Sequence, residues 1–232
     1  MLATSLESLH GGLIVSCQAP ASSPLHHPLV IAAMAEAAVN QGAVGVRIDS
    51  PSHIEAVRAR VTQPIIGLWK QVIPDYSVYI TPQLSQAEAV ASTGSDIIAV
   101  DATQRPRPGG ETLAPLIRHI HKRLGKPVMA DVDTLENALL AIEAGADCVG
   151  TTLFGYTEAT QGQTPPGLEL LAAMVKHSPV PVICEGGIAT SAVAQQALEL
   201  GAYAVVVGTA ITGIDSLVGE YVSALKSSRV AQ

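Results

Sequence analysis

A pattern of hydrophobic and polar positions returns four times along the chain. Each copy is an alanine-rich run with helical spacing of its apolar residues, then a glycine, then a short apolar run. The glycines are Gly42, Gly94, Gly145 and Gly201, separated by 52, 51 and 56 residues. Glycine directly after an amphipathic run is typical of the end of a helix. An unbroken apolar run such as AVVV is typical of a strand buried on both faces. The pattern therefore predicts four helix–strand units.

Four further apolar runs lie between these units. They are LIVSCQ (13–18), PIIGLWK (64–70), PVMAD (127–131) and PVICE (181–185). Three of them begin with proline, which is tolerated at the first position of a strand. Eight short buried strands that alternate with helices predict an α/β protein, a single-domain (β/α)₈ TIM barrel spanning residues 1–232. An open doubly wound sheet is the main competitor, but the GxGxxG turn typical of that fold does not follow the first strand.

Composition and charge exclude several classes of protein. Apolar residues make up 48% of the chain and charged residues 14%, which argues against intrinsic disorder. The net charge is −7, and no basic cluster stands out, so no nucleic-acid partner is expected. The N-terminus lacks the pattern of a signal peptide, and the most apolar stretch, 202–214, is too short to span a bilayer. We expect no membrane partner, and the sequence leaves a homo-oligomer open.

The three cysteines indicate a reducing compartment. Cys17, Cys148 and Cys184 lie in apolar runs and show no CxxC spacing. Cysteines of this kind are typical of reduced, buried thiols in a cytosolic protein. A cytoplasmic location is therefore expected.

Polar residues end several predicted strands, where a barrel of this kind carries its active site. Lys70 ends an apolar run, and partial desolvation there would lower its pKa. A neutral amine at that place can take up a proton or form a Schiff base. Glu185 ends the seventh strand and is a second acid–base candidate or an anchor for a substrate hydroxyl. The competing interpretation is that both are ordinary solvent-exposed groups at strand ends.

Weaker candidates end three other strands. Gln18 ends the first strand, Arg47 lies in the second, and Asp131 ends the fifth. For Arg47 and Asp131, an ion pair at the barrel mouth is as good an interpretation as a role in binding substrate.

Two glycine motifs follow the last two strands. They are EGGI (185–188) and VGTA (207–210), each placed ahead of a helix. In many barrels these two loops bind phosphate through backbone N–H groups and a helix N-terminus. Two ordinary tight turns are the alternative. The motifs favour a small phosphorylated ligand.

Other features carry less information. The RPRPGG stretch (105–110) is either a loop over the barrel mouth that places an arginine on an anion, or a rigid surface loop. The segment 153–166 is a lid candidate. The histidines form no ligand set at a strand end, so no metal site is predicted.

Together these motifs resemble a known family. SCQA (16–19), GVRI (45–48), IGLWK (66–70), DATQRPRP (101–108), MADVDT (129–134), GTTLFGYT (150–157), CEGGI (184–188) and VVVGTAIT (205–212) resemble the N-acetylmannosamine-6-phosphate 2-epimerase family, in order and over nearly the whole chain. The resemblance implies a cytoplasmic barrel enzyme of sialic acid catabolism that needs no metal or organic cofactor. It would interconvert N-acetyl-D-mannosamine 6-phosphate and N-acetyl-D-glucosamine 6-phosphate. The family's residues fall on catalytic Lys70 and Glu185, substrate-binding Gln18, Arg47 and Asp131, and phosphate-binding Gly187, Gly208 and Thr209.

The chemistry of this reaction agrees with the strand-end residues. In the open aldehyde form, the C2 proton lies alpha to a carbonyl and a base can remove it. Lys70 and Glu185 come from strands that face each other across an eight-stranded barrel, on opposite sides of a bound sugar. The sequence leaves two schemes open. Either both groups exchange protons with carbon, or Lys70 serves both faces while Glu185 handles oxygen.

Three other functions fit parts of the same pattern. A strand-end lysine beside a phosphate site also suits a Schiff-base (class I) aldolase of a sugar phosphate. Another phosphate-binding TIM-barrel isomerase or synthase, acting on a pentulose or indole phosphate, is a second alternative. A non-catalytic module that binds sugar phosphates is the third.

Overall fold

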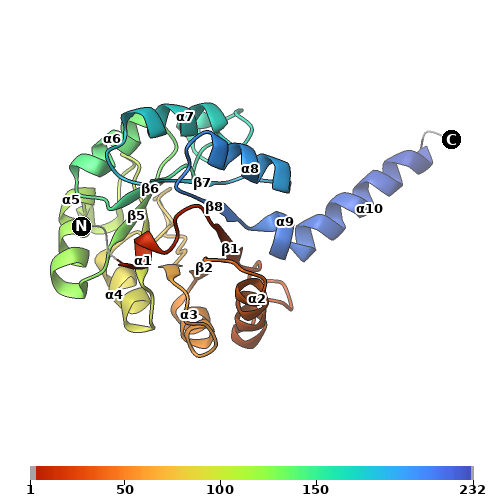
Figure 1. The fold of residues 1–232 in the computed structure, drawn as a ribbon, viewed down its shortest axis with the longest axis horizontal. Helices are drawn as coiled ribbons and strands as arrows, with labels where there is room; N and C mark the ends of the chain where they lie inside the picture. Colours follow the sequence, from red (N-terminus) through yellow and green to blue (C-terminus); the bar gives the residue numbers. More distant parts are fainter. Residues whose placement is uncertain (1–3, 231–232) are drawn as a thin grey trace.

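Eight parallel strands close into a barrel in sequence order, β1 to β8 (Figure 1). This is a computed structural model, and it describes residues 4–230. The predicted TIM barrel is confirmed, whereas the predicted domain limits at 1 and 232 lie outside the described residues. The strands are β1 (Leu13–Cys17), β2 (Gly45–Asp49), β3 (Ile65–Leu68), β4 (Ile97–Asp101), β5 (Val128–Asp131), β6 (Cys148–Gly150), β7 (Val182–Glu185) and β8 (Ala204–Val207).

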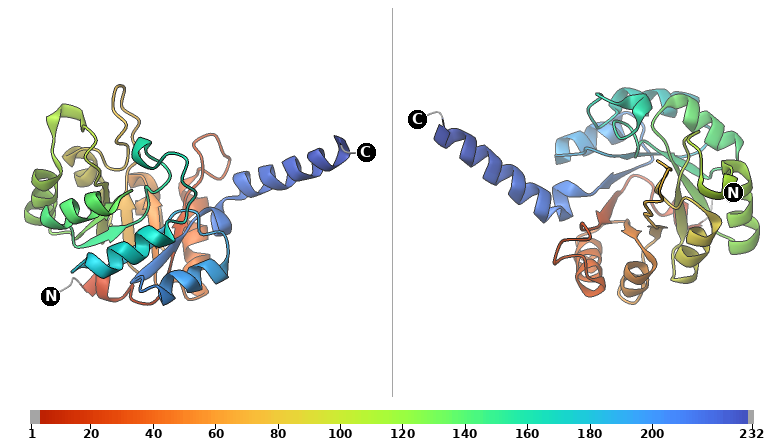
Figure 2. Two further views of the ribbon diagram at one scale, coloured as in Figure 1. Left: turned by 90° about the horizontal axis from the view of Figure 1, so that it is seen from above. Right: turned by 180° about the vertical axis from the view of Figure 1, so that it is seen from behind.

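Helices alternate with these strands and form the outer layer of the barrel (Figures 1 and 2). The helices that follow β1 to β7 are α2 (Pro28–Asn40), α3 (Pro51–Arg58), α4 (Leu84–Ser92), α5 (Leu113–His119), α6 (Leu135–Glu143), α7 (Leu168–His177) and α8 (Ser191–Glu199). The four repeat glycines each adopt a left-handed backbone just beyond α2, α4, α6 or α8, with φ between 96° and 105°. Only glycine adopts this conformation without strain, which explains the repeat.

Alternate residues of each strand pack on opposite sides of the barrel wall. On β7, Val182 and Cys184 pack in the layer between strands and helices, whereas Ile183 belongs to the cluster inside the barrel. The same cluster includes Leu6 and Leu9, at and just beyond the short helix α1 (Thr4–Glu7), which closes the lower end of the barrel. The interior is therefore a filled core that is covered at one end, and only the end at the carboxyl ends of the strands stays open.

The same two-residue period determines which polar side chains reach that free end. Ile66 and Leu68 of β3 point inward, and Lys70 continues their series two residues later. Glu185 follows Ile183 in the same way, and Asp131 follows Met129. Because these residues come last on the inward face, they lie at the carboxyl ends of the strands.

The last helix departs from the barrel. After β8, a four-residue helix α9 (Thr209–Thr212) leads into α10 (Ile214–Val230), which projects away from the outer layer in every view (Figures 1 and 2). Several of its apolar side chains are exposed, among them Tyr221 and Leu225. No helix in the described part of the chain combines the length and apolar character needed to cross a membrane.

Candidate functional site

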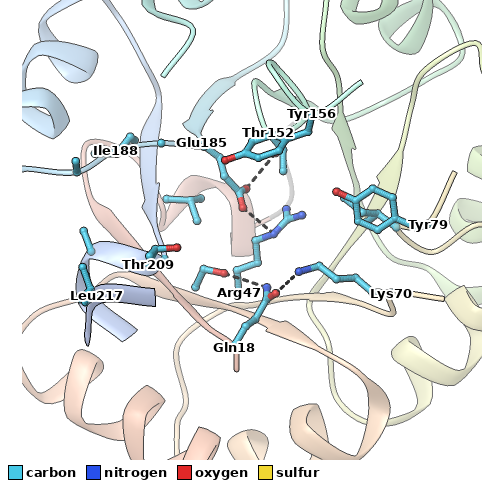
Figure 3. A pocket seen from close by; sticks show the side chains of 18 of the residues that line it. Gln18, Arg47, Lys70, Tyr79, Thr152, Tyr156, Glu185, Ile188, Thr209 and Leu217 are labelled. Carbon is cyan, nitrogen blue, oxygen red and sulfur yellow. Dashed lines mark hydrogen bonds and ion pairs between the residues drawn. The ribbon is translucent and has the colours of Figure 1, made fainter. Parts of the chain in front are cut away.

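A cavity of about 640 Å³ opens at the carboxyl ends of the strands. Figure 3 shows Lys70 and Glu185 pointing into it from opposite sides, with Arg47 between them. The cavity is lined by most of the predicted site residues, namely Gln18, Arg47, Lys70, Glu185, Gly187, Gly208 and Thr209. Asp131 lies below this wall and is fully buried.

Arg47 connects the buried acids at the centre of the site. Its guanidinium contacts both carboxylate oxygens of Asp131, at 2.6 and 3.2 Å, and its Nε lies 3.1 Å from Glu185. The Arg47 side chain is 1% exposed. Burial acts to lower its pKa, but the carboxylates of Asp131 and Glu185 outweigh burial and raise it. Arg47 therefore stays positively charged, and the suggested Asp–Arg ion pair exists at the bottom of the cavity.

Glu185 has the environment of a group that can gain or lose a proton near neutral pH. Burial raises the pKa of Glu185 to about 7, and nearby Asp131 adds to the rise while Arg47 opposes it. Thr152 donates its hydroxyl hydrogen bond to Asp131 at 2.6 Å and lies 3.2 Å from a Glu185 oxygen. Arg47 and Thr152 thus each contact one carboxyl oxygen of Glu185, and the carboxyl group borders the cavity.

The backbone of Glu185 is fixed independently of its side chain. Its N–H donates to the hydroxyl of Thr151 at 3.0 Å, and that hydroxyl donates to the Glu185 carbonyl at 2.8 Å. Thr151 directly follows β6, so the end of β6 holds the end of β7 in place. This contact limits the positions that the Glu185 carboxyl group can take.

Lys70 stands on the opposite wall of the cavity. The side chain is exposed to the open cavity, although protein atoms surround it closely on other sides. That enclosure lowers the pKa of Lys70, and the charge of Asp49 acts in the opposite direction. Asp49 also accepts the backbone N–H of Lys70 at 2.9 Å. A lysine of this kind provides a neutral amine more readily than a lysine in water.

Gln18 orients the Lys70 amine. Its carbonyl oxygen accepts a hydrogen bond from Nζ of Lys70, and its amide nitrogen donates to the hydroxyl of Ser16 at 3.0 Å. A protonated Lys70 only donates, so the carbonyl end of the amide faces the lysine, and the Ser16 hydroxyl accepts from the other end. Gln18 therefore lies where the sequence places it, at the cavity, with Lys70 as its neighbour.

The two glycine loops border the cavity on the side of β7 and β8. Gly187 has φ of +67°, and a Cβ there would lie 2.4 Å from Pro165. A Cβ at Gly208 would lie 3.4 Å from Ser16, in van der Waals contact. Thr209 begins α9, and the first N–H groups of a helix have no partner within it. Residues of both loops thus line the cavity.

The structure shows where the side chains of the lid candidate (153–166) and of the RPRPGG motif (105–110) lie relative to the cavity. Tyr156 borders the cavity and is 58% exposed, but Thr157 is buried and donates to Asp133 at 2.6 Å. Arg105 pairs with Asp101 at 2.5 Å, and Arg107 is buried. Neither arginine lines the cavity, so the interpretation that this motif places an arginine on a bound anion finds no support in the geometry.

The cysteines are buried and unpaired by disulfides, as expected. Burial raises the pKa of the Cys17 thiol to about 12 and that of Cys184 to about 11. In the described part of the chain, no three side chains of His, Cys, Asp or Glu gather as a metal site would require. The reactive groups of the cavity are therefore a lysine, a carboxyl group and an arginine.

A family model matches most of this chain. Its description is a provisional N-acetylmannosamine-6-phosphate epimerase, and the match runs over residues 31–227. The chain belongs to this epimerase family. The matched region contains every predicted site residue except Gln18.

Similar members of the epimerase family span nearly the whole chain. A Synechococcus elongatus protein with the provisional name N-acetylmannosamine-6-phosphate 2-epimerase is 61% identical over 224 residues, 96% of this chain and 97% of its own. A protein of that name from Cutibacterium acnes is 44% identical, over 95% and 96% of the two chains. The structure of the N-acetylmannosamine-6-phosphate 2-epimerase from Clostridium perfringens matches with a TM-score of 0.91 and 39% identity, over 95% and 96% of the two chains.

A more distant structure shows the fold alone. Thiamine phosphate pyrophosphorylase from Pyrococcus furiosus matches with a TM-score of 0.60 and 18% identity, over 90% of this chain and 89% of the other.

Sequence reasoning missed one side chain that the epimerase cavity presents prominently. Tyr79 borders the cavity on the side of Lys70 (Figure 3). Burial raises the pKa of Tyr79 to about 12, and the carboxylates of Asp131 and Asp101 add to the rise. The hydroxyl therefore remains a hydrogen-bond donor. Its place in a loop between β3 and α4 gives no strand-end signal, although two tyrosines close together, Tyr76 and Tyr79, are a weak signal in this aromatic-poor chain.

Proposed function

We propose that this protein interconverts N-acetyl-D-mannosamine 6-phosphate and N-acetyl-D-glucosamine 6-phosphate by moving the proton at C2. The observation that carries the proposal is the pair Lys70 and Glu185 on opposite walls of one cavity, both with shifted pKa values. Enzymes shift pKa values in this way to make acids and bases work at neutral pH. Membership of the epimerase family supports the choice of substrate.

Lys70 is proposed to act on carbon. In the open-chain sugar, the C2 proton lies alpha to the aldehyde, and the neutral amine of Lys70 removes it to leave an enolate across C1 and C2. The Lys70 side chain is long and flexible, and among the described residues its amine donates to the side-chain carbonyl of Gln18 alone. Return of a proton to the other face of the planar intermediate inverts C2.

Glu185 is proposed to act on oxygen, together with Arg47. The carboxyl group is held by Arg47 and Thr152, which limits its reach but gives it a fixed orientation toward the cavity. A protonated Glu185 donates to the aldehyde oxygen as negative charge develops there. Arg47 stabilises that charge from below, and Asp131 holds Arg47 in place.

We propose that the reaction needs no metal or organic cofactor. A charged arginine and a carboxyl group that titrates near pH 7 supply the charge stabilisation that a Lewis acid would otherwise give to the enolate. Gln18 is proposed to bind the substrate beside Lys70. Asp131 is proposed to contribute to substrate binding indirectly, by holding Arg47 in place. Backbone N–H groups at Gly187, Gly208 and Thr209 are proposed to bind the 6-phosphate.

The phosphate site gives the first test of this function. We expect unphosphorylated N-acetylmannosamine to react with a kcat/KM lower by at least about 10²-fold, with kcat lowered as well as KM raised, because the phosphate contacts orient the open-chain sugar. Steady-state kinetics with both sugars measure the effect. Similar kcat/KM values for the two sugars would contradict the phosphate site.

We also propose a cytoplasmic place for this reaction, in the breakdown of sialic acids and other amino sugars, as a single catalytic domain of residues 1–232. Three buried cysteines outside any disulfide suit a reducing compartment. A doubly charged sugar phosphate is retained where it is made, so an enzyme that uses one acts inside the cell. Neither a nucleic acid nor a membrane is proposed as a partner.

The projecting helix supports a homo-oligomer. Exposed apolar residues follow one another along one face of α10, namely Ile214, Val218, Tyr221, Val222 and Leu225. A second copy carries the same apolar face, so two chains can bury these side chains together. We expect light scattering to give at least a dimer, and the double substitution Tyr221→Glu and Leu225→Glu to give a monomer. A monomeric wild-type chain would contradict the proposal.

A further inference from the structure

The segment between β3 and α4, residues 69–83, folds into a hairpin at the barrel mouth, and we call it the β3–α4 arm. Gln71 donates its N–H to the carbonyl of Tyr79 at 2.9 Å, and Lys70 pairs with Ile80 as in an antiparallel sheet. This pairing places the Lys70 and Tyr79 side chains at the same cavity (Figure 3). The arm therefore carries two of the polar groups that border the cavity.

The base of the arm is closed by Trp69 and Thr81. The backbone N–H of Thr81 donates to the Trp69 carbonyl at 2.9 Å, and the Trp69 N–H donates to the Thr81 hydroxyl at 3.1 Å. Such a two-stranded hairpin is marginally stable by itself. It needs contacts with the rest of the protein in order to hold Lys70 in one place.

Arg105 supplies such contacts from the loop after β4. Its guanidinium donates to the carbonyl of Ser77 in the arm at 3.0 Å, to the Asp101 carboxylate at 2.5 Å and to the Thr103 hydroxyl at 2.9 Å. Asp101 is fully buried at the end of β4, and its N–H donates to the carbonyl of Ile80 in the arm at 2.9 Å. One arginine thus joins the far side of the arm to a fixed strand.

Arg107 holds the end of the arm in a similar way. It is 4% exposed and donates from Nη1 to the carbonyl of Pro82 at 3.1 Å. Its other terminal nitrogen is buried without a hydrogen-bond partner. The two arginines of the RPRP motif are therefore both directed at the arm.

We propose that Arg105 is a positioning residue for the epimerase reaction, because it fixes the arm that holds Lys70 and Tyr79 at the cavity. The proposal rests on the proposed function for its kinetic consequences, but not for the contact between Arg105 and the arm. Displacement of a catalytic group by about 1 Å can cost roughly 10²-fold in rate. Loss of the bridge that Arg105 forms between Ser77 in the arm and Asp101 at the end of β4 would allow displacements of this size.

The variants for the test are Arg105→Gln and Arg105→Lys. Glutamine removes the ion pair with Asp101 and most of the contacts. Lysine keeps a positive charge beside the buried Asp101, yet a single amine cannot replace the three separate contacts of the guanidinium. The matched control is Arg60→Gln, which removes a surface ion pair with Glu36 at 3.2 Å.

The tryptophan of the chain reports on the arm without any substrate. Trp69 is the single tryptophan, and it lies at the base of the arm. We expect the acrylamide quenching constant of its fluorescence to rise about two-fold in Arg105→Gln and by a smaller amount in Arg105→Lys, because a loosened arm opens to solvent more often. Arg60→Gln should quench like the wild type.

Kinetics of the same variants test positioning. We expect kcat per folded molecule to fall about ten-fold in Arg105→Gln, with KM changed much less and with a partial recovery in Arg105→Lys. The pH optimum of kcat should move upward, because a more solvated Lys70 has a pKa closer to its ordinary value. The charged groups that face Lys70 are unchanged in these variants, and they are Asp49, Arg47, Glu185 and Asp131.

The outcomes separate this proposal from the proposed function. If wild-type protein lacks epimerase activity while Trp69 quenching still rises in the Arg105 variants, the proposed function fails and the contact with the arm stands. Unchanged quenching in folded Arg105→Gln would overturn the proposal, as would a loss of rate with the wild-type pH optimum. If Arg105→Gln does not fold, unchanged quenching and unchanged kcat in Arg105→Lys overturn it.

Discussion

Replacement of Lys70 with alanine is expected to lower kcat by at least about 10²–10⁴-fold, the usual contribution of a general acid–base group. The structural reason is the position of the amine, which points into the cavity opposite Glu185 and is the only group proposed to act on C2. The fold should survive, because the side chain is exposed to the cavity and the backbone N–H bond to Asp49 is kept.

Conversion of N-acetylmannosamine 6-phosphate followed by NMR measures this loss, and circular dichroism checks the fold. Lys176→Ala is the matched control, because Lys176 is an exposed lysine near the end of α7 and far from the described cavity. Activity of Lys70→Ala within a few-fold of the wild type would remove Lys70 from the mechanism.

The second large effect is expected for Glu185→Gln. The amide keeps the shape of the side chain and its contact with Thr152, but it loses the proton that the carboxyl group exchanges. We expect kcat to fall by about 10²-fold or more while ligand affinity stays within roughly ten-fold. Calorimetry with the sugar phosphate measures affinity, and Glu199→Gln on α8 is the surface control. If lost binding accounts for the whole defect, Glu185 is an anchor and not an acid.

The pH profile gives Glu185→Gln a second readout. Wild-type kcat should be bell-shaped, because activity requires a neutral Lys70 and a protonated Glu185 at the same time. The pKa of Glu185 is raised to about 7 and that of Lys70 is lowered, so the bell should lie in the neutral to alkaline range. Residual activity of Glu185→Gln should rise with pH without the alkaline decline, because only the lysine then titrates. A bell of unchanged shape would contradict the role of Glu185.

Much of the barrel is predictable because its rules are local. Buried parallel strands need unbroken apolar runs, and the left-handed glycine after every second helix marks where the next strand begins. The two-residue period then tells which side of a strand faces inward, so Lys70 and Glu185 can be placed at the cavity before any coordinates are known. The Arg47–Asp131 ion pair follows from the same period, since both residues point into the barrel.

The two-residue period does not determine how deep in the barrel an inward-facing side chain lies. Asp131 ends its strand as expected, yet it lies beneath Arg47 and outside the cavity wall. Which polar group reaches the opening depends on the stagger between neighbouring strands, where Asp131 is opposite Asp101 on one side and Gly150 on the other. That pairing joins residues far apart in the sequence, so the local pattern of a strand does not predict it.

Loop contacts are the other part that sequence reasoning did not supply. Tyr79 reaches the cavity because the β3–α4 arm folds back, and Arg105 finds its partners through the end of β4. The projecting α10 shows the same limit. Its apolar periodicity identifies a face to be buried, but periodicity does not say which surface covers it.

The central claim is that Lys70 moves the C2 proton of a phosphorylated amino sugar, while Glu185 exchanges a proton with the aldehyde oxygen, and that no metal takes part. It is tested most directly by NMR of N-acetylmannosamine 6-phosphate with EDTA-treated protein in D₂O. The account predicts N-acetylglucosamine 6-phosphate that carries deuterium at C2, formed at the same rate before and after chelation. A loss of turnover on chelation that a divalent metal restores, or an unchanged C2 configuration with active-site residues intact, would contradict it.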